Sequence, residues 1–139
     1  MSYLLDTCVI SELVAKQPKE SVLAWMAELD SEKAFLSVVA LGEIQKGIER
    51  LPACRRKEDL RAWLTDDLLV RFRGRILPLD TEVMLAWGAM ISRLEADGTP
   101  MPLLDSLVAA TALHRGLVLV TRNEDDFERS GVGLVNPWK

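Results

Sequence analysis

The 139-residue sequence predicts an α/β fold of three layers, in which a short and mainly parallel β-sheet lies between helices on both faces. Apolar segments of strand length alternate with segments whose apolar residues recur at helical spacing, as in parallel sheets. Leu117–Thr121 is continuous, apolar and rich in β-branched residues, which is typical of a strand buried on both faces. No repeat, linker or low-complexity tract divides the chain, so we expect one domain over residues 1–139.

The N-terminal half opens with a short apolar strand that delivers an aspartate, Asp6, at its end. The helices that follow have apolar residues at helical spacing, and Pro52 ends the last of them. The expected elements, in order, are strand Tyr3–Leu5, helix Val9–Val14, helix Glu20–Leu29, strand Ala34–Ser37 and helix Val39–Leu51.

The C-terminal half continues the alternation, and its turn residues mark the boundaries. Gly74 breaks a long helix, Pro78 indicates an edge strand or a strand end, and Gly116 is placed as a helix C-cap. The expected elements are helix Arg55–Arg71, strand Ile76–Leu79, helix Asp80–Glu95, helix Leu103–His114, strand Leu117–Thr121 and strand Gly133–Val135.

Composition limits the classes of function. A net charge of −4 is unusual for a nucleic-acid binder, but a carboxylate-rich metal site lowers the charge by itself, and a bound cation restores attraction for phosphate. The two cysteines, Cys8 and Cys54, form no Cys-x-x-Cys pair, which argues against zinc. Few cysteines and no apolar run long enough for a bilayer predict a cytoplasmic protein with no membrane association.

Three carboxylates stand in apolar surroundings. Asp6 ends a strand, and Glu43 and Asp105 lie near the starts of apolar helices. A single acid near a helix start can simply cap the helix or favour its dipole. Three in one small α/β chain favour a shared site, because ligands in such folds bind beyond the carboxyl ends of the strands.

Converging carboxylates repel one another. Two unit charges about 4 Å apart at an effective dielectric near 20 cost on the order of 4 kcal/mol, so the cluster needs a cation at neutral pH. Oxygen ligands favour Mg²⁺ or Mn²⁺. A metal-held water is a nucleophile, and the metal neutralises charge on a phosphoryl oxygen, so the cluster points to phosphodiester hydrolysis.

Four segments, in this order, resemble the motifs of PIN-domain ribonucleases, and in particular the toxin components of VapBC-type toxin–antitoxin pairs. The likeness extends along nearly the whole chain and includes the C-terminal ending. The matching segments are Leu4–Ser11, Val38–Glu43, Gly98–Ala110, Leu119–Phe127 and the ending Val135–Trp138.

The resemblance implies a PIN-like fold and a metal-dependent endoribonuclease toxin that cleaves RNA. It also implies inhibition by a cognate antitoxin protein and a homodimer. The helical segments Val22–Leu29 and Ala53–Leu69, with mixed apolar faces, are candidates for contact with either partner. By the same resemblance Asp6, Glu43 and Asp105 bind the metal, Mg²⁺ or Mn²⁺.

The fourth acidic position of the motif set falls on Asn123, where many members carry aspartate. Asn123 could orient a metal-bound water, and Asp126 is the alternative as the fourth acid. Thr7 and Thr121 are expected to support the carboxylates by hydrogen bonds. Cys8 is a second departure, at a position where asparagine or serine is usual.

Basic side chains near loops are the candidates for RNA contact. Arg73 and Arg75 bracket Gly74, and Arg122 stands beside Asn123, so these three are predicted to contact phosphates. The cluster Arg55–Lys57 is interpreted as a solvated helix face.

Two other functions are weighed against the nuclease. Because Asn123 replaces a carboxylate, the chain could be a catalytically weak PIN-like binding module that acts through a partner protein and DNA. A phosphatase of the haloacid-dehalogenase kind would need a second aspartate where Cys8 stands. A single histidine, His114, leaves no histidine-based metal site.

Overall fold

The computed structural model describes residues 1–139 and contains the five predicted strands. The strands are β1 (Tyr3–Leu5), β2 (Ala34–Ser37), β3 (Ile76–Leu77), β4 (Val118–Val120) and β5 (Leu134–Val135). The helices are α1 (Thr7–Leu13), α2 (Glu20–Glu28), α3 (Val38–Glu49), α4 (Arg55–Trp63), α5 (Leu69–Arg71), α6 (Thr81–Ala96), α7 (Leu103–Arg115) and α8 (Glu124–Phe127), with helical turns at Ser31–Lys33, Leu64–Leu68 and Glu128–Ser130.

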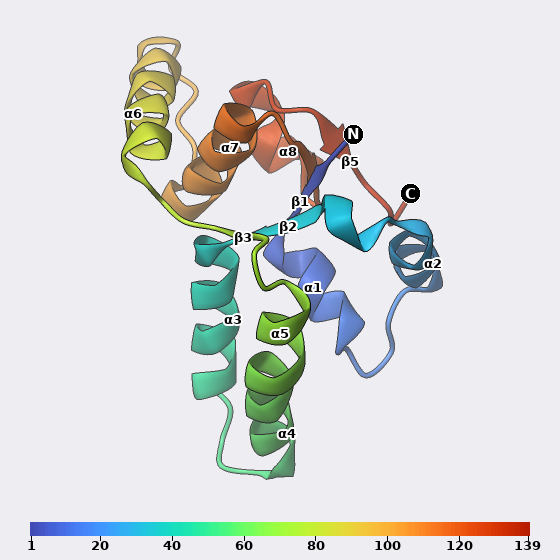
Figure 1. The fold of residues 1–139 in the computed structure, drawn as a ribbon. Coiled ribbons are helices and arrows are strands. Elements are labelled where there is room, and N and C mark those ends of the chain that lie inside the picture. Colours follow the sequence, from blue (N-terminus) through green and yellow to red (C-terminus); the bar gives the residue numbers. More distant parts are fainter.

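The strands form one sheet in the order β3-β2-β1-β4-β5, and every neighbouring pair is parallel (Figure 1). The chain therefore builds the sheet outward from β1 to β3, and then returns to the other side of β1 to add β4 and β5. The order reverses between β1 and β4. In parallel α/β sheets the crevice beyond the carboxyl ends of two such strands is where ligands bind.

Helices cover both faces of the sheet, which confirms the three-layer prediction. Alternate residues of the central strands point into two separate cores: Leu4 and Leu119 into one, Leu5 and Val120 into the other. The first core packs under α6 and α7, and the second under α1 to α4. Figure 1 shows α6, α7 and α8 on one side of the sheet and α3, α4 and α5 on the other.

Local chemistry explains most of the boundaries. Helix α7 ends at Gly116, whose φ of 68° is the left-handed C-cap conformation that glycine adopts without strain. Strand β3 is shorter than expected because it stops before Pro78, and it lies at the edge of the sheet, as that proline indicates.

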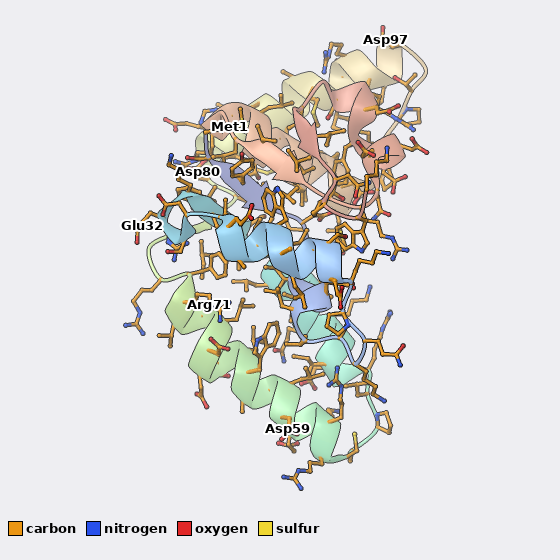
Figure 2. All side chains as sticks on the ribbon, turned by 90° about the vertical axis from the view of Figure 1, so that its right-hand side faces the viewer. Met1, Glu32, Asp59, Arg71, Asp80 and Asp97 are labelled. Carbon is orange, nitrogen blue, oxygen red and sulfur yellow. The ribbon has the colours of Figure 1, made fainter.

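Two elements differ from the sequence-based expectation. The predicted helix Arg55–Arg71 is interrupted by a wider π-helical turn at Leu64–Leu68, so α4 and α5 are two parts of one arm, with Asp59 toward one end and Arg71 at the other (Figure 2). Helix α8 was not expected, because a helix of four residues is too short to show a periodic pattern.

No helix of the structure is both long enough and apolar enough to cross a lipid bilayer.

Candidate active site

The site begins at Asp6, the first residue after β1. Its Oδ1 accepts a hydrogen bond from the backbone N–H of Thr7 at 2.9 Å, so Asp6 caps α1. Its Oδ2 accepts one from the hydroxyl of Thr121 at 2.8 Å, which joins the ends of the paired strands β1 and β4. Asp6 is 8% exposed and Thr121 is fully buried. The switch point of the sheet thus presents a buried, fixed carboxylate.

Glu43 reaches the same edge from the second turn of α3. The hydroxyl of Thr7 donates to its Oε1 at 2.8 Å, which joins α3 to the start of α1. Ser37 caps α3 through a bond from the backbone N–H of Val39 at 3.0 Å and so fixes where the helix begins after β2. Thr7 and Thr121 therefore each hold one carboxylate by a short hydrogen bond.

Asp105 lies in the first turn of α7 and is partly buried. Burial, together with the negative charges of Asp6, Asp126 and Glu43, raises its pKa to about 6. The pKa of Asp6 is also raised, mainly by burial and further by the charge of Glu43, although its hydrogen bonds from Thr121 and Thr7 oppose the shift. Asp105 is thus within electrostatic reach of three carboxylates from other elements, Asp6, Glu43 and Asp126.

The donor set fits a hard divalent cation. All of these side chains offer oxygen, which Mg²⁺ and Mn²⁺ prefer. No three Asp, Glu, His or Cys side chains converge closely enough to hold one ion together. That spacing is compatible with Mg²⁺, which usually takes one or two carboxylates and keeps several waters.

The two candidates for the fourth position differ in their electrostatic role. The backbone N–H of Asn123 donates to the hydroxyl of Thr121 at 3.1 Å, and Asn123 precedes the first residue of α8. Asp126, one turn further along, contributes to the raised pKa of Asp105. Both are exposed at the carboxyl edge of the sheet.

The structure separates the three arginines predicted to contact RNA. Arg122 directly follows Thr121 at the carboxyl edge, whereas Arg73 and Arg75 precede β3 and so lie toward the amino edge. The guanidinium of Arg75 donates to the carbonyls of Ser31, Ala34 and Arg71 and lies 5.0 Å from the ring centroid of Phe72. Only Arg122 of the three is brought beside the carboxylates.

Two features of the site did not emerge from the sequence. The thiol of Cys8 lies 3.7 Å from Oδ2 of Asp6 and accepts from the backbone N–H of Arg122 at 3.5 Å, which links α1 to the end of β4. The C-terminal tail also folds back here, with Trp138 under Arg122. The position of Cys8 two residues after Asp6 was a signal for the first feature; nothing local indicated the second.

Fold and site together define a parallel three-layer α/β domain with a carboxylate cluster at the switch point of its sheet. Residues 3–132 match the family model described as PIN domain, and the chain belongs to that family. It is 32% identical over 136 residues to VapC ribonuclease Y4jK of Sinorhizobium fredii, covering 98% of this chain and 97% of that one. It is 36% identical over 135 residues to Toxin FitB of Neisseria gonorrhoeae, covering 97% of each. The solved structure of FitAB bound to an IR36 DNA fragment superposes with a TM-score of 0.94 at 34% identity, over 99% of this chain and 96% of that chain.

Proposed function

We propose that this chain is a Mg²⁺- or Mn²⁺-dependent endoribonuclease and the toxin component of a type II toxin–antitoxin pair. The observation that carries the proposal is the set of carboxylates Asp6, Glu43 and Asp105, which come from three elements at the switch point. Burial and the charge of Glu43 raise the pKa of Asp6, and burial with the charges of Asp6 and Glu43 raises the pKa of Asp105. Relatives with the names VapC ribonuclease and Toxin FitB support it.

In this proposal Asp6, Glu43 and Asp105 would hold the cation between them, one or two of them directly and the rest through its bound waters. A bound divalent ion would activate water and neutralise charge on the phosphoryl group. The hydroxyls of Thr121 and Thr7 keep the carboxylates of Asp6 and Glu43 in fixed orientations, so little reorganisation is needed when charge develops at phosphorus. Hydrolysis consumes one water: a P–O bond forms to the water oxygen, the bond to one ester oxygen breaks, and the leaving oxygen takes up a proton.

Asp126 is our choice for the fourth acid. Its charge contributes to the raised pKa of Asp105, which an amide at Asn123 cannot do. Asn123 then has a structural role, because its backbone N–H donates to the hydroxyl of Thr121 and it directly precedes α8. Loss of cleavage in Asn123→Ala with full activity in Asp126→Asn would reverse this assignment.

The proposal is tested by incubating the purified chain with a structured RNA pool in Mn²⁺, in Mg²⁺ and in EDTA. We expect cleavage with either metal and none in EDTA. Asp105→Asn, purified in the same way, controls for contaminating ribonucleases and should be inactive. A folded wild-type chain that binds Mn²⁺ and leaves every RNA intact would count against the nuclease.

Thr121→Val is expected to lower the cleavage rate about tenfold, the lower end of what loss of a partner behind a metal ligand costs. Valine has a similar shape but cannot donate to Oδ2 of Asp6, whose position is then no longer fixed. Thr121→Ser keeps the hydroxyl and is the matched control. Equal rates for the valine and serine variants would show that this hydrogen bond does not matter for cleavage.

Partners are proposed on two grounds. We expect inhibition by a cognate antitoxin, in line with the FitAB complex, and co-expression of a short reading frame adjacent to the gene should relieve growth inhibition.

We also expect a homodimer, because the neighbouring helices α6 and α7 expose the side chains of Leu85, Leu103 and Leu104 at 71%, 61% and 41%. Sedimentation analysis of wild type and Leu103→Glu would test this expectation.

A second candidate function is a binding module that acts through a partner protein and DNA. The presence of Asn123 in place of a carboxylate favours it, as does the DNA in the FitAB complex. Metal binding without RNA cleavage, together with promoter binding by the complex alone, would support this alternative.

A further inference from the structure

A polar hollow of about 450 Å³ lies beside Arg122, the residue that follows Thr121, and beside Trp138 of the C-terminal tail. It lies between the α1–α2 loop and the residues after β4, and its charged lining side chains are the cations Lys19 and Arg122 and the acids Glu12 and Glu20. Its lining residues are Glu12, Gln17, Pro18, Lys19, Glu20, Arg122 and Trp138. An arginine beside an aromatic ring is one of the components from which proteins build sites for nucleic-acid strands.

Arg122 is free to bind an anion. Its side chain is exposed and forms no ion pair or hydrogen bond within the chain, while its guanidinium carbon lies 5.9 Å from the ring centroid of Trp138. Stacking of this kind restricts the guanidinium and leaves its N–H groups available. Arg122 is therefore held in place by an aromatic ring and not by a carboxylate.

Two of the neighbouring acids, Glu124 and Glu12, accept hydrogen bonds within the chain. Glu124 accepts hydrogen bonds from Lys139 at 2.6 Å and from the amide of Asn136 at 3.1 Å, and these contacts hold its pKa below the usual range. Glu12 accepts from the backbone N–H of Lys19 at 2.6 Å. The C-terminal tail thus neutralises the carboxylate nearest in sequence to Arg122 while it supplies the ring beneath the guanidinium.

The backbone of Arg122 is fixed relative to the carboxylates. Its N–H donates to the thiol of Cys8 at 3.5 Å, and its carbonyl accepts from the amide of Asn136 at 3.4 Å. The preceding residue, Thr121, donates to Asp6. A phosphate bound by this guanidinium would therefore sit at a set position relative to the cluster.

We propose that Arg122, supported by Trp138, binds a backbone phosphate of RNA next to the cleavage site and so positions the strand along the hollow toward the carboxylates. This inference rests on the proposed nuclease function for its substrate. The strand enters between Lys19 and the C-terminal tail. Arg122 contacts the phosphate directly, and Trp138 is a positioning residue that acts through Arg122.

The test measures binding without cleavage, by fluorescence anisotropy of a short labelled single-stranded RNA in EDTA at several salt concentrations. Arg122→Gln is expected to weaken binding by about tenfold, as for one charge-assisted hydrogen-bonded contact. Loss of one phosphate contact should also reduce the slope of log K against log salt by about 0.7. The matched control is Arg55→Gln, which removes the same charge from a side chain that is 94% exposed on α4.

Trp138 has a separate test. Trp138→Leu should weaken RNA binding about threefold, in the range of one cation–π contact. Trp138→Phe should restore part of the loss. The double variant Arg122→Gln/Trp138→Leu should bind no worse than Arg122→Gln, because the ring acts only through the guanidinium. Additive losses would mean that Trp138 has a contact of its own, and would overturn this part of the proposal.

The outcomes separate this inference from the proposed function. If wild type cleaves RNA and Arg122→Gln matches Arg55→Gln in affinity and salt slope, the inference is wrong and the nuclease stands. If wild type binds RNA through Arg122 but cleaves none with metal, the nuclease is wrong and the inference stands. If wild type binds no RNA in EDTA at low salt, the inference is wrong. Where cleavage is measured, Arg122→Gln should raise KM more than it lowers kcat.

Discussion

Replacement of Asp6 by asparagine is expected to abolish growth inhibition and to lower the RNA cleavage rate by at least about 100-fold, since loss of even an indirect partner of a metal ligand costs 10 to 100-fold. The variant removes a charge at the switch point while the amide oxygen can still accept from Thr7 or Thr121. Because burial disfavours the ionised form of Asp6, its replacement by a neutral side chain should not lower the melting temperature.

The matched control for this prediction is Asp59→Asn. Asp59 lies on α4 with its side chain 70% exposed, and its one ion pair, to Arg55, is 4.0 Å long and exposed. It should keep full toxicity and full cleavage. Toxicity retained in Asp6→Asn, with a normal unfolding curve, would remove Asp6 from the catalytic site.

The free energy of unfolding of the metal-free protein is expected to fall as the pH rises from about 4 to about 7, and Asp105 should account for about 1 to 2 kcal/mol of that loss. The folded pKa of about 6 lies above the ordinary value of 3.8, so the folded state holds the proton more tightly. Stability from this group is therefore complete below the ordinary pKa and disappears as the pH rises through the folded pKa. The 1 to 2 kcal/mol is less than the whole pKa shift of Asp105 would give, because its carboxyl group is partly exposed and screened by solvent.

Denaturant unfolding of wild type and Asp105→Asn in EDTA checks this prediction across the same pH range. The difference between the two proteins isolates Asp105 from Asp6, whose pKa is also raised. Added Mg²⁺ at neutral pH should stabilise wild type more than the variant, because a ligand bound only by the folded state adds stability. Parallel pH profiles, with equal responses to Mg²⁺, would contradict the proposed electrostatic role of Asp105.

The sheet could be predicted because each strand carries its own signal. Leu117–Thr121 is apolar throughout, and the structure buries Leu119 and Val120 in two different cores. Helix α8 could not be predicted, because four residues are too few to show helical spacing. Its position depends on Phe127, which is fully buried among residues distant in sequence. The π turn at Leu64–Leu68 was missed for a related reason, since one shifted turn hardly changes the apolar pattern of the arm.

Site residues could be predicted from the sequence where a carboxylate stands in an apolar segment, because such a side chain contributes nothing to core packing. Asp6 and Asp105 are acids in apolar segments, and the structure raises the pKa of both. Arginines in polar loops give no such signal. The sequence therefore could not distinguish Arg75, whose guanidinium donates to backbone carbonyls, from Arg122, whose guanidinium has no hydrogen-bond partner in the chain. Contacts made by the tail, such as Trp138 with Arg122, join positions that no local pattern connects.

The hydrogen bond between Asp6 and Thr121 has a consequence for the timing of synthesis. Its two partners are 115 residues apart in sequence, so β4 is made long after β1. Until β4 has left the ribosome, β1 has no partner strand on that side, and Thr121 cannot bond to Asp6. Such distant contacts form late because loop closure must precede them. The carboxylate of Asp6 therefore gains this partner only after Thr121 has been made, and a product truncated before Thr121 would lack it.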